Sequence, residues 1–453
     1  MLPVALTLGG QQLARSKTSE PSEVKSQYQS QLEDDGNLPI VECFLLMSLS
    51  SDGGVPPALP NMAHDIGFAG AILIDLMLDR RILFQHGRVE LVDCAPTGHT
   101  LLDQALQKLR LASSDLLTLG QSLELLAEDA SNLKHAGFEH LTDRGLVTIK
   151  RRVLVSGFEA HFFPHTKDGN RRSLMSRLVR SEDLELQDVL AVCAANACGL
   201  FGESLSKKRA KRLANQVHQL VEANVVGEEV IETIEATSQA CRRHNQHSAS
   251  TAAGKRAQEN KKNNNWEWRA FWSDRRPVIT PCDTTGLDAS VKFKTTNVSD
   301  RYLLIPERRD NIKMRKHGLE VKELIESHRH YEAFRPKEVL KFPIKAGDLA
   351  RVFPRLYGRS GKVSDEAELE ATLRAHGYAP RHVDVEKLRN RVRLADDVRL
   401  EFCQFTVEHR TCWSACVEGP DFSRVRTCVH TINPQEGRVM GYMDFLHRIV
   451  GEQ

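Results

Sequence analysis

The chain has 453 residues, and this length predicts two or three domains, because a single hydrophobic core seldom extends beyond about 250–300 residues. Hydrophobic residues make up 41% of the sequence and charged residues 27%, which excludes a chain that is disordered throughout. The formal net charge of +2 by itself favours no partner, and we expect no nucleic acid among the ligands.

The first 37 residues should form a disordered arm. Residues 11–37 are rich in Ser, Gln, Glu and Lys and hold almost no large apolar side chains, so they cannot bury enough surface to fold. Residues 1–10 lack the basic flank and the long apolar run of a secretory signal. We therefore expect the protein to be cytoplasmic.

From residue 38 to about residue 235 the pattern predicts a mainly helical domain. Apolar residues recur there at spacings of three and four, and alternating segments at 88–92 and within 146–155 predict small β-hairpins between the helices. The longest apolar run, residues 66–78, is interrupted by Asp75 and is shorter than the ~20 residues that cross a bilayer, so membrane contact should be peripheral. The expected helices are 66–80, 101–111, 120–130, 138–144, 173–179, 186–198 and 207–223.

Two segments of this domain resemble the Golgi phosphoprotein 3 family. Residues 67–82, GFAGAILIDLMLDRRI, are similar to the family helix of pattern G-x-x-G-A-x-L-x-E-L-x-L-x-x-R-I. Residues 95–106, APTGHTLLDQAL, resemble the family element P-T-G-d-x-L-L-D-e-A-L. Further similar segments are 141–147, 163–164 and 172–178.

The resemblance covers residues 38–235, and it implies a compact, mostly helical, non-catalytic domain at the cytosolic face of a membrane. In eukaryotes that membrane would be the Golgi. The implied ligand is phosphatidylinositol 4-phosphate, and the implied partners are an anionic membrane surface and a protein cargo, with no cofactor required. A phosphorylated headgroup needs several cationic donors that converge on one pocket.

By the same resemblance, two family arginines in a later helix fall at Ser131 and Lys134, and only Lys134 keeps the charge. Arg80 and Arg81, near the end of the first family helix, supply further cations. The expected headgroup-binding residues are therefore Lys134, Arg80 and Arg81, and the alternative for Lys134 is a solvated helix lysine. The family's tryptophan falls near Pro60, and another family arginine falls at Ala69.

Residues 236–265, rich in Ser, Gln, His, Asn and Lys, predict a polar, basic linker. From residue 266 the apolar period changes to two, which predicts an α+β domain over 266–453 with an antiparallel sheet, open or closed into a barrel. Residues 38–235 carry 20 Lys and Arg against 26 Asp and Glu, whereas residues 266–453 carry 33 against 28. The second domain is therefore the better candidate for binding an anion.

Charged residues alternate with apolar ones along several expected strands of this second domain. Because residues two apart on a strand share a face, Lys313 and Arg315 should point together, as should Glu320 and Lys322. Cationic faces turned inward would suit a polyphosphate chain, and carboxylates among them would suit its divalent metal. The expected phosphate-binding residues are Lys313, Arg315, Lys322, Lys341 and Arg391, and the expected metal ligands are Glu267, Glu401 and Glu418.

Short segments of residues 266–450 resemble the CYTH-like, or triphosphate tunnel, superfamily. They are SDRYLLI at 299–305, NIKMR at 311–315, VLKFP at 339–343 and CVEGPD at 416–421. Enzymes of that superfamily begin with a strand E-x-E-x-K that carries two metal-binding acids, and here the strand WEWRA supplies Glu267 alone. The resemblance implies Mg²⁺ or Mn²⁺ in this domain if it is catalytic.

Three functions follow from these patterns. The first is a non-enzymatic, phosphoinositide-binding peripheral membrane adaptor with an appended anion-binding domain. The second is a metal-dependent hydrolase or binder of triphosphate or polyphosphate, acting through the second domain. The third is a scaffold in which both sites have decayed.

Overall fold

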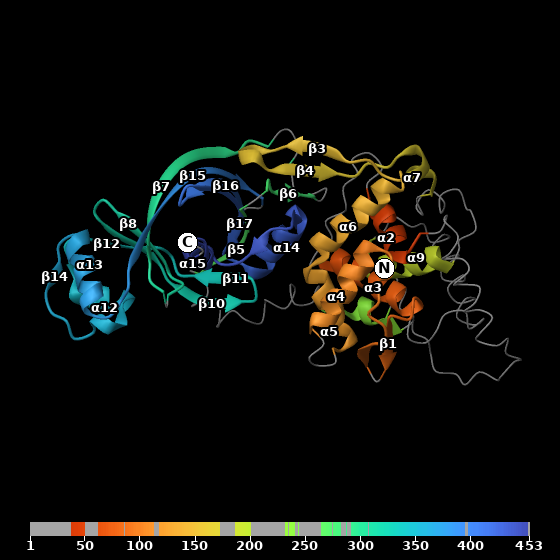
Figure 1. Cartoon of the computed structure of the whole chain (residues 1–453), viewed down its shortest axis with the longest axis horizontal. Helices are drawn as coiled ribbons and strands as arrows, with labels where there is room; N and C mark the ends of the chain where they lie inside the picture. The colour runs from red at the N-terminus through yellow and green to blue at the C-terminus, as the bar shows by residue number, and fades with distance from the viewer. Residues whose placement is uncertain are drawn as a thin grey trace, which may run out of the picture.

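The computed structural model shows a helical domain followed by a strongly curled sheet (Figure 1). The predicted arm, most of the linker and the predicted helices 173–179 and 207–223 lie outside the residues that the structure describes. The described residues are 38–49, 62–85, 87–112, 117–172, 186–200, 232–233, 235–240, 243, 264–273, 275–281, 287, 291–306, 308–394 and 397–451.

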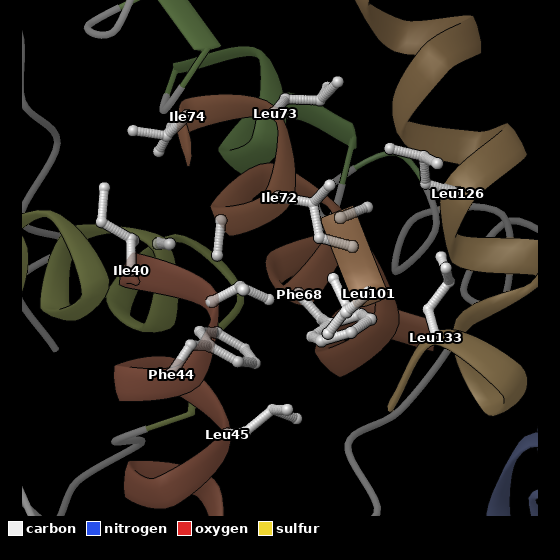
Figure 2. Close-up of a cluster of buried hydrophobic side chains, with 14 of the residues drawn as sticks. Ile40, Phe44, Leu45, Phe68, Ile72, Leu73, Ile74, Leu101, Leu126 and Leu133 are labelled. Atoms are coloured by element: carbon white, nitrogen blue, oxygen red, sulfur yellow. The ribbon is translucent and has the colours of Figure 1, made fainter. Parts of the chain in front are cut away.

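The helical domain is built around α3 (Ala63–Leu78). Residues 63–76 of this helix are all buried, because it is apolar on every side and must be enclosed by other helices. In Figure 2, Phe68 and Ile72 of α3 lie among side chains from several neighbouring helices. These neighbours and the other helices of the domain are α2 (Ile40–Ser48), α4 (Thr100–Ala112), α5 (Leu119–Glu128), α6 (Ala130–Asp143), α7 (Lys167–Arg172) and α9 (Leu186–Ala197). None of the described helices is both long enough and apolar enough to cross a bilayer.

Asp75 interrupts the apolar sequence of α3, and its side chain caps the first turn of the neighbouring helix α2. Its two carboxylate oxygens accept the backbone N–H groups of Ile40, at 2.9 Å, and Val41, at 2.8 Å, in the first turn of α2. Those N–H groups have no partner inside their own helix. Burial raises the pKa of Asp75 to about 7 in spite of these two hydrogen bonds.

Small β elements join the helices, as expected, and one of them reaches the second domain. Strands β1 (Ile82–Gln85) and β2 (Arg88–Leu91) form a hairpin. A second hairpin, β3 (Lys150–Val153) and β4 (Glu159–Phe162), continues into a four-stranded sheet in which β4 pairs in parallel with β6 (Val278–Ile279). This sheet is completed by β18 (Pro434–Gln435), so the two domains share main-chain hydrogen bonds.

The second domain is an eleven-stranded antiparallel sheet in the order β10-β11-β5-β17-β16-β15-β7-β8-β9-β12, with β19 paired to β5. It curls into a half-barrel (Figure 1), which confirms the predicted layout of a helical part followed by a β-rich part. Strand β7 pairs with β15 along its whole length, including its polar middle. The strands are β5 (Asn265–Trp272), β7 (Lys294–Leu304), β8 (Asn311–Arg315), β9 (Gly318–Lys322), β10 (Leu324–His328), β11 (Tyr331–Phe334), β12 (Glu338–Lys341), β15 (Arg381–Arg393), β16 (Arg399–Val407), β17 (Arg410–Gly419) and β19 (Arg438–Val439).

Helices cover both faces of the curled sheet. On the convex face, α14 packs against β5 and β17, and a small layer with α12 and α13 packs against β8, β9 and β12. On the concave face, α15 packs against β5, β7, β15 and β16. The elements are α12 (Ala346–Val352), the 3₁₀ helix Pro354–Leu356, α13 (Glu366–Ala375), α14 (Phe422–Ile432), α15 (Tyr442–Gly451), β13 (Ile344–Lys345) and β14 (Lys362–Val363).

Candidate functional site on the concave face of the sheet

Strand alternation sends charged side chains to the concave face. On β8, Ile312 and Met314 enter the apolar cluster of the convex side, so Lys313 and Arg315 point the other way. On β16, Phe402 lies in the convex cluster while Glu401 and its same-face neighbours point inward. The shared faces expected from the sequence are therefore present.

Aromatic residues of α15 fill one end of the concave face. The Phe445 ring stacks on Phe271 of β5 at a centroid distance of 4.0 Å, and Tyr442 stacks on Tyr302 of β7 at 5.2 Å. Residues further along the same strands are charged, so the apolar plug ends where a polar cavity begins.

That polar cavity has a volume of about 60 Å³ and gathers side chains from β5, β7, β8, β9, β15, β16 and β17. Five expected residues line it, namely Lys313, Lys322, Glu267, Glu401 and Glu418. The complete lining is Glu267, Arg269, Tyr302, Asn311, Lys313, Lys322, Lys387, Arg389, Glu401, Cys403, Cys416, Glu418 and Tyr442.

Three cations surround Asp300 beside the cavity. Lys313 Nζ lies 2.9 Å from Asp300 Oδ2, Arg315 Nη1 lies 2.9 Å from Oδ1, and Lys387 Nζ lies 3.1 Å from Oδ2. Burial alone would raise the pKa of Asp300, but the charges of Lys387 and Lys313 outweigh it and hold this pKa well below its usual range. Asp300 is therefore the anion that keeps these cations together when no ligand is bound.

Lys387 is the most deeply buried of the cavity's lysines. Its ammonium donates a hydrogen bond to the Tyr302 hydroxyl and lies 4.3 Å from the centroid of the Tyr442 ring. Burial, followed by the charge of Lys313, lowers the pKa of Lys387 to about 7. Its charge can therefore respond to pH in the physiological range.

Each of two cavity carboxylates has a close cationic partner. Lys322 Nζ lies 2.6 Å from Glu267 Oε1, and Arg389 Nε lies 2.7 Å from Glu401 Oε2. Arg269 adds weaker contacts to both carboxylates, at 3.7 Å to Glu267 and 3.8 Å to Glu401. These charges outweigh burial and lower the pKa of Glu267 and of Glu401, so both groups are ionised.

The expected metal ligands share the cavity but do not form a compact donor set. Among the described residues, such a compact set occurs in the helical domain instead. It consists of Glu42, His99 and His140, whose donor atoms all lie within 4.8 Å of one another. Three other expected residues, Arg315, Lys341 and Arg391, lie outside the cavity lining, and Lys341 is exposed on strand β12.

Sequence reasoning missed three cations of the cavity, Arg269, Lys387 and Arg389. Lys387 and Arg389 share a face of β15 with the expected Arg391, so their common orientation could be predicted from the alternation along the strand. The alternation could not show how far along β15 the cavity extends. Arg269 lies two residues after Glu267 on β5, so the same alternation places both side chains on one face.

The cations expected to bind a lipid headgroup are not brought together. Lys134 is 4% exposed, lies 2.9 Å from His64 Nδ1 and forms a short ion pair with Asp65 at the start of α3. Arg80 and Arg81 follow the other end of this 16-residue helix, which is about 24 Å long. Arg81 is itself paired, with Asp79 at 2.8 Å and with Asp93.

Lys134 belongs instead to the contact between the two domains. Asp65, its partner, also lies 2.7 Å from His430 Nδ1 on α14 of the second domain. Nearby, Asn132 Oδ1 accepts the backbone N–H of Glu436 at 2.9 Å. A groove of about 360 Å³ runs between the domains here, and Ser131 is among its lining residues. The second domain thus packs where the family resemblance placed two headgroup residues.

Comparison with known protein families supports the first resemblance. Residues 40–237 match the family model Golgi phosphoprotein 3 (GPP34). The match spans the helical domain, which we refer to as the Golgi phosphoprotein 3-like domain, and it covers less than half of the chain. A search of the curated proteins found no match to this chain.

Proposed function

We propose that the chain is a peripheral membrane adaptor whose second domain binds a phosphorylated anion of the triphosphate or polyphosphate class. Its Golgi phosphoprotein 3-like domain would attach it to an anionic, phosphoinositide-containing membrane, at the cytosolic face of the Golgi in a eukaryote. The observation that carries the anion-binding part is the convergence of Arg269, Lys313, Lys322, Lys387 and Arg389, from four strands, on one cavity.

Several cations in one cavity suit phosphate because each phosphoryl group offers oxygens that accept charge-assisted hydrogen bonds. In the structure the carboxylates Asp300, Glu267 and Glu401 occupy that role. A phosphate chain would replace some of these carboxylate contacts, and the cavity would widen as the paired side chains separate. Lys322 and Arg315 are partly exposed, which gives an anion access from solvent.

Metal-dependent hydrolysis is the second candidate, and one observation favours it. Glu267, Glu401 and Glu418 line the same cavity as the cations, as a metal-assisted reaction on a triphosphate would require. However, Arg269 lies between Glu267 and Glu401 and contacts both. A cation at this position competes with a divalent metal for the same carboxylates, so binding without turnover is the better-supported function.

Incubating the full chain with tripolyphosphate separates these two functions. We expect saturable binding by calorimetry and no release of inorganic phosphate in the presence of Mg²⁺ or Mn²⁺ at micromolar protein. Release that requires the metal and stops with EDTA would establish the hydrolase instead. Failure of tripolyphosphate to bind at low salt would reject both.

The membrane part of the proposal rests on the family match and on exposed groups near the β1–β2 hairpin. Leu83 is 37% exposed and Val92 is 54% exposed, and the backbone N–H of Val92 bonds to the carbonyl of Arg81, beside exposed Arg80. Apolar and basic groups together suit an anionic lipid surface. Vesicle co-sedimentation tests this, and binding that is unchanged by phosphatidylinositol 4-phosphate would indicate attachment by surface charge alone.

A further inference from the structure

A carboxylate and two histidines meet inside the Golgi phosphoprotein 3-like domain, far along the chain from the cavity of the sheet. Glu42 lies in the first turn of α2, His99 directly precedes α4, and His140 lies in the last turn of α6. Their donor atoms all lie within 4.8 Å of one another. The three residues therefore connect three separate helices of the core.

Both histidines aim a ring nitrogen at the same oxygen of Glu42. His99 Nε2 lies 3.0 Å from Glu42 Oε1, and His140 Nδ1 is in short contact with that same atom. The two rings lie side by side, with centroids 4.4 Å apart. These contacts place one carboxylate oxygen and two imidazole nitrogens within reach of a single metal ion.

The cluster leaves buried polar atoms without hydrogen-bond partners. Glu42 is 0% exposed, and its second oxygen, Oε2, accepts no hydrogen bond, with Arg144 Nη1 the nearest cation at 3.6 Å. The Nδ1 atom of His99 is likewise buried without a partner. Burial would raise the pKa of Glu42, but the hydrogen bonds from His140 and His99 outweigh it, so the carboxylate stays ionised. An ionised carboxylate is one of the ligands that a transition metal needs.

We propose that Glu42, His99 and His140 form a zinc site that ties α2, α4 and α6 together. Two imidazole nitrogens and one carboxylate oxygen are a common donor set for Zn²⁺, and ligand atoms at roughly 2.0–2.2 Å from one ion lie about 3.3 Å apart. The observed 3.0 Å between His99 Nε2 and Glu42 Oε1 is close to that spacing, whereas His140 Nδ1 lies closer to this oxygen and would have to move away from it as the ion enters. His140 has a side chain that is 34% exposed, which leaves a path for the ion and a water as fourth ligand.

Zinc binding to the EDTA-stripped full chain tests the site. Calorimetry should show one Zn²⁺ per chain, and the thermal melting temperature should rise with Zn²⁺ but not with Mg²⁺, because nitrogen ligands favour the softer metal. His140→Gln should weaken Zn²⁺ binding by about a hundredfold, since it removes a direct ligand. His135→Gln, on the same helix but outside the cluster, is the matched control and should bind Zn²⁺ as the unaltered chain does.

Folding of the variants is checked independently by far-UV circular dichroism, and His140 is the preferred position because it is the most exposed of the three. A second measurement on the unaltered chain uses Co²⁺ in place of Zn²⁺, and a visible absorption band should appear at one equivalent. The proposal is overturned if the unaltered chain binds no stoichiometric Zn²⁺, or if His140→Gln binds it as tightly as His135→Gln.

Discussion

The helical domain and the curled sheet place their cations in opposite ways. In the helical domain the expected headgroup cation Lys134 points into the contact between domains and is neutralised by Asp65, while Arg80 and Arg81 lie past the far end of α3. In the sheet, cations from four strands meet at one cavity. Family resemblance alone therefore does not establish a binding site, whereas strand alternation on a curved sheet brings like side chains together.

The reason lies in geometry. On a strand, every second residue must point to the same face, and curling turns that face inward, so distant strands deliver side chains to one place. On helices, the direction of a side chain depends on how the whole bundle packs. Four changes sharpen this contrast, from the largest expected effect to the smallest.

Replacing Lys134 tests whether it is a buried structural cation. Lys134→Met should lower the free energy of unfolding by about 3–5 kcal/mol, because it leaves Asp65 buried without its closest positive partner. Chemical denaturation of the full chain measures this. Arg80→Met, at an exposed position, is the control and should leave the stability nearly unchanged. Equal small effects of both changes would place Lys134 at the surface in solution.

The protonation of Lys387 should make anion binding depend on pH. Because its pKa in the folded chain is about 7, tripolyphosphate affinity should fall about tenfold between pH 6 and pH 8 as one charge-assisted hydrogen bond is lost. This decrease runs against the growing negative charge of the phosphate itself. Lys387→Met should remove the decrease, and an unaltered profile in that variant would exclude Lys387 as its source.

The lowered pKa of Lys387 should also make the stability of the folded chain depend on pH. The ordinary pKa of lysine, 10.5, lies above the folded value, so between about pH 7 and 10.5 the unfolded chain holds the extra proton. The contribution of Lys387 to the stability of the unliganded chain should therefore increase as the pH rises through that window.

Reversing the exposed charge of Arg80 tests the membrane surface. Arg80→Glu should reduce binding to anionic vesicles at least about fivefold, since each basic residue near such a surface contributes about 1 kcal/mol and the new carboxylate is repelled. Lys362→Glu, at an exposed position of strand β14 in the other domain, is the matched charge reversal. If both variants sediment equally well, the hairpin end of the helical domain is not the membrane-facing surface.

Neutralising Glu401 distinguishes binding from metal chemistry in the cavity. Glu401→Gln frees Arg389 from its carboxylate, so tripolyphosphate affinity should rise about threefold, in line with the modest strength of a partly exposed ion pair. The same change should weaken binding if a metal held by Glu401 carries the anion. Calorimetry gives the affinity, and circular dichroism confirms that the variant is folded.

The sequence predicted the local features of both domains well. Apolar spacing located α3, α4, α5 and α9 to within a few residues, and alternation correctly paired Lys313 with Arg315 on the concave face. Each of these features depends on neighbours along the chain. The predicted helix at 138–144 was too short, because α6 begins at Ala130, where Ser, Asn and Lys interrupt the apolar pattern.

The features that remained hidden depend on residues far apart in the chain. Lys134 meets Asp65 across 69 positions, and Glu42 meets His140 across 98. The pairing of β4 with β6 could not be predicted from the sequence, because β6 has only two residues and shows no alternating pattern. The extent of the cavity was hidden as well, because α15 sets it by filling one end of the concave face.

Calorimetric titration of the full chain with tripolyphosphate, at low salt and pH 6.5, tests most directly whether the cations of the concave face bind a phosphorylated anion. The unaltered chain and Lys362→Gln should bind one anion with the same affinity, and Lys313→Gln should bind at least about tenfold more weakly because it loses one charge-assisted contact. Equal affinities for Lys313→Gln and Lys362→Gln, or no saturable binding at all, would contradict the account.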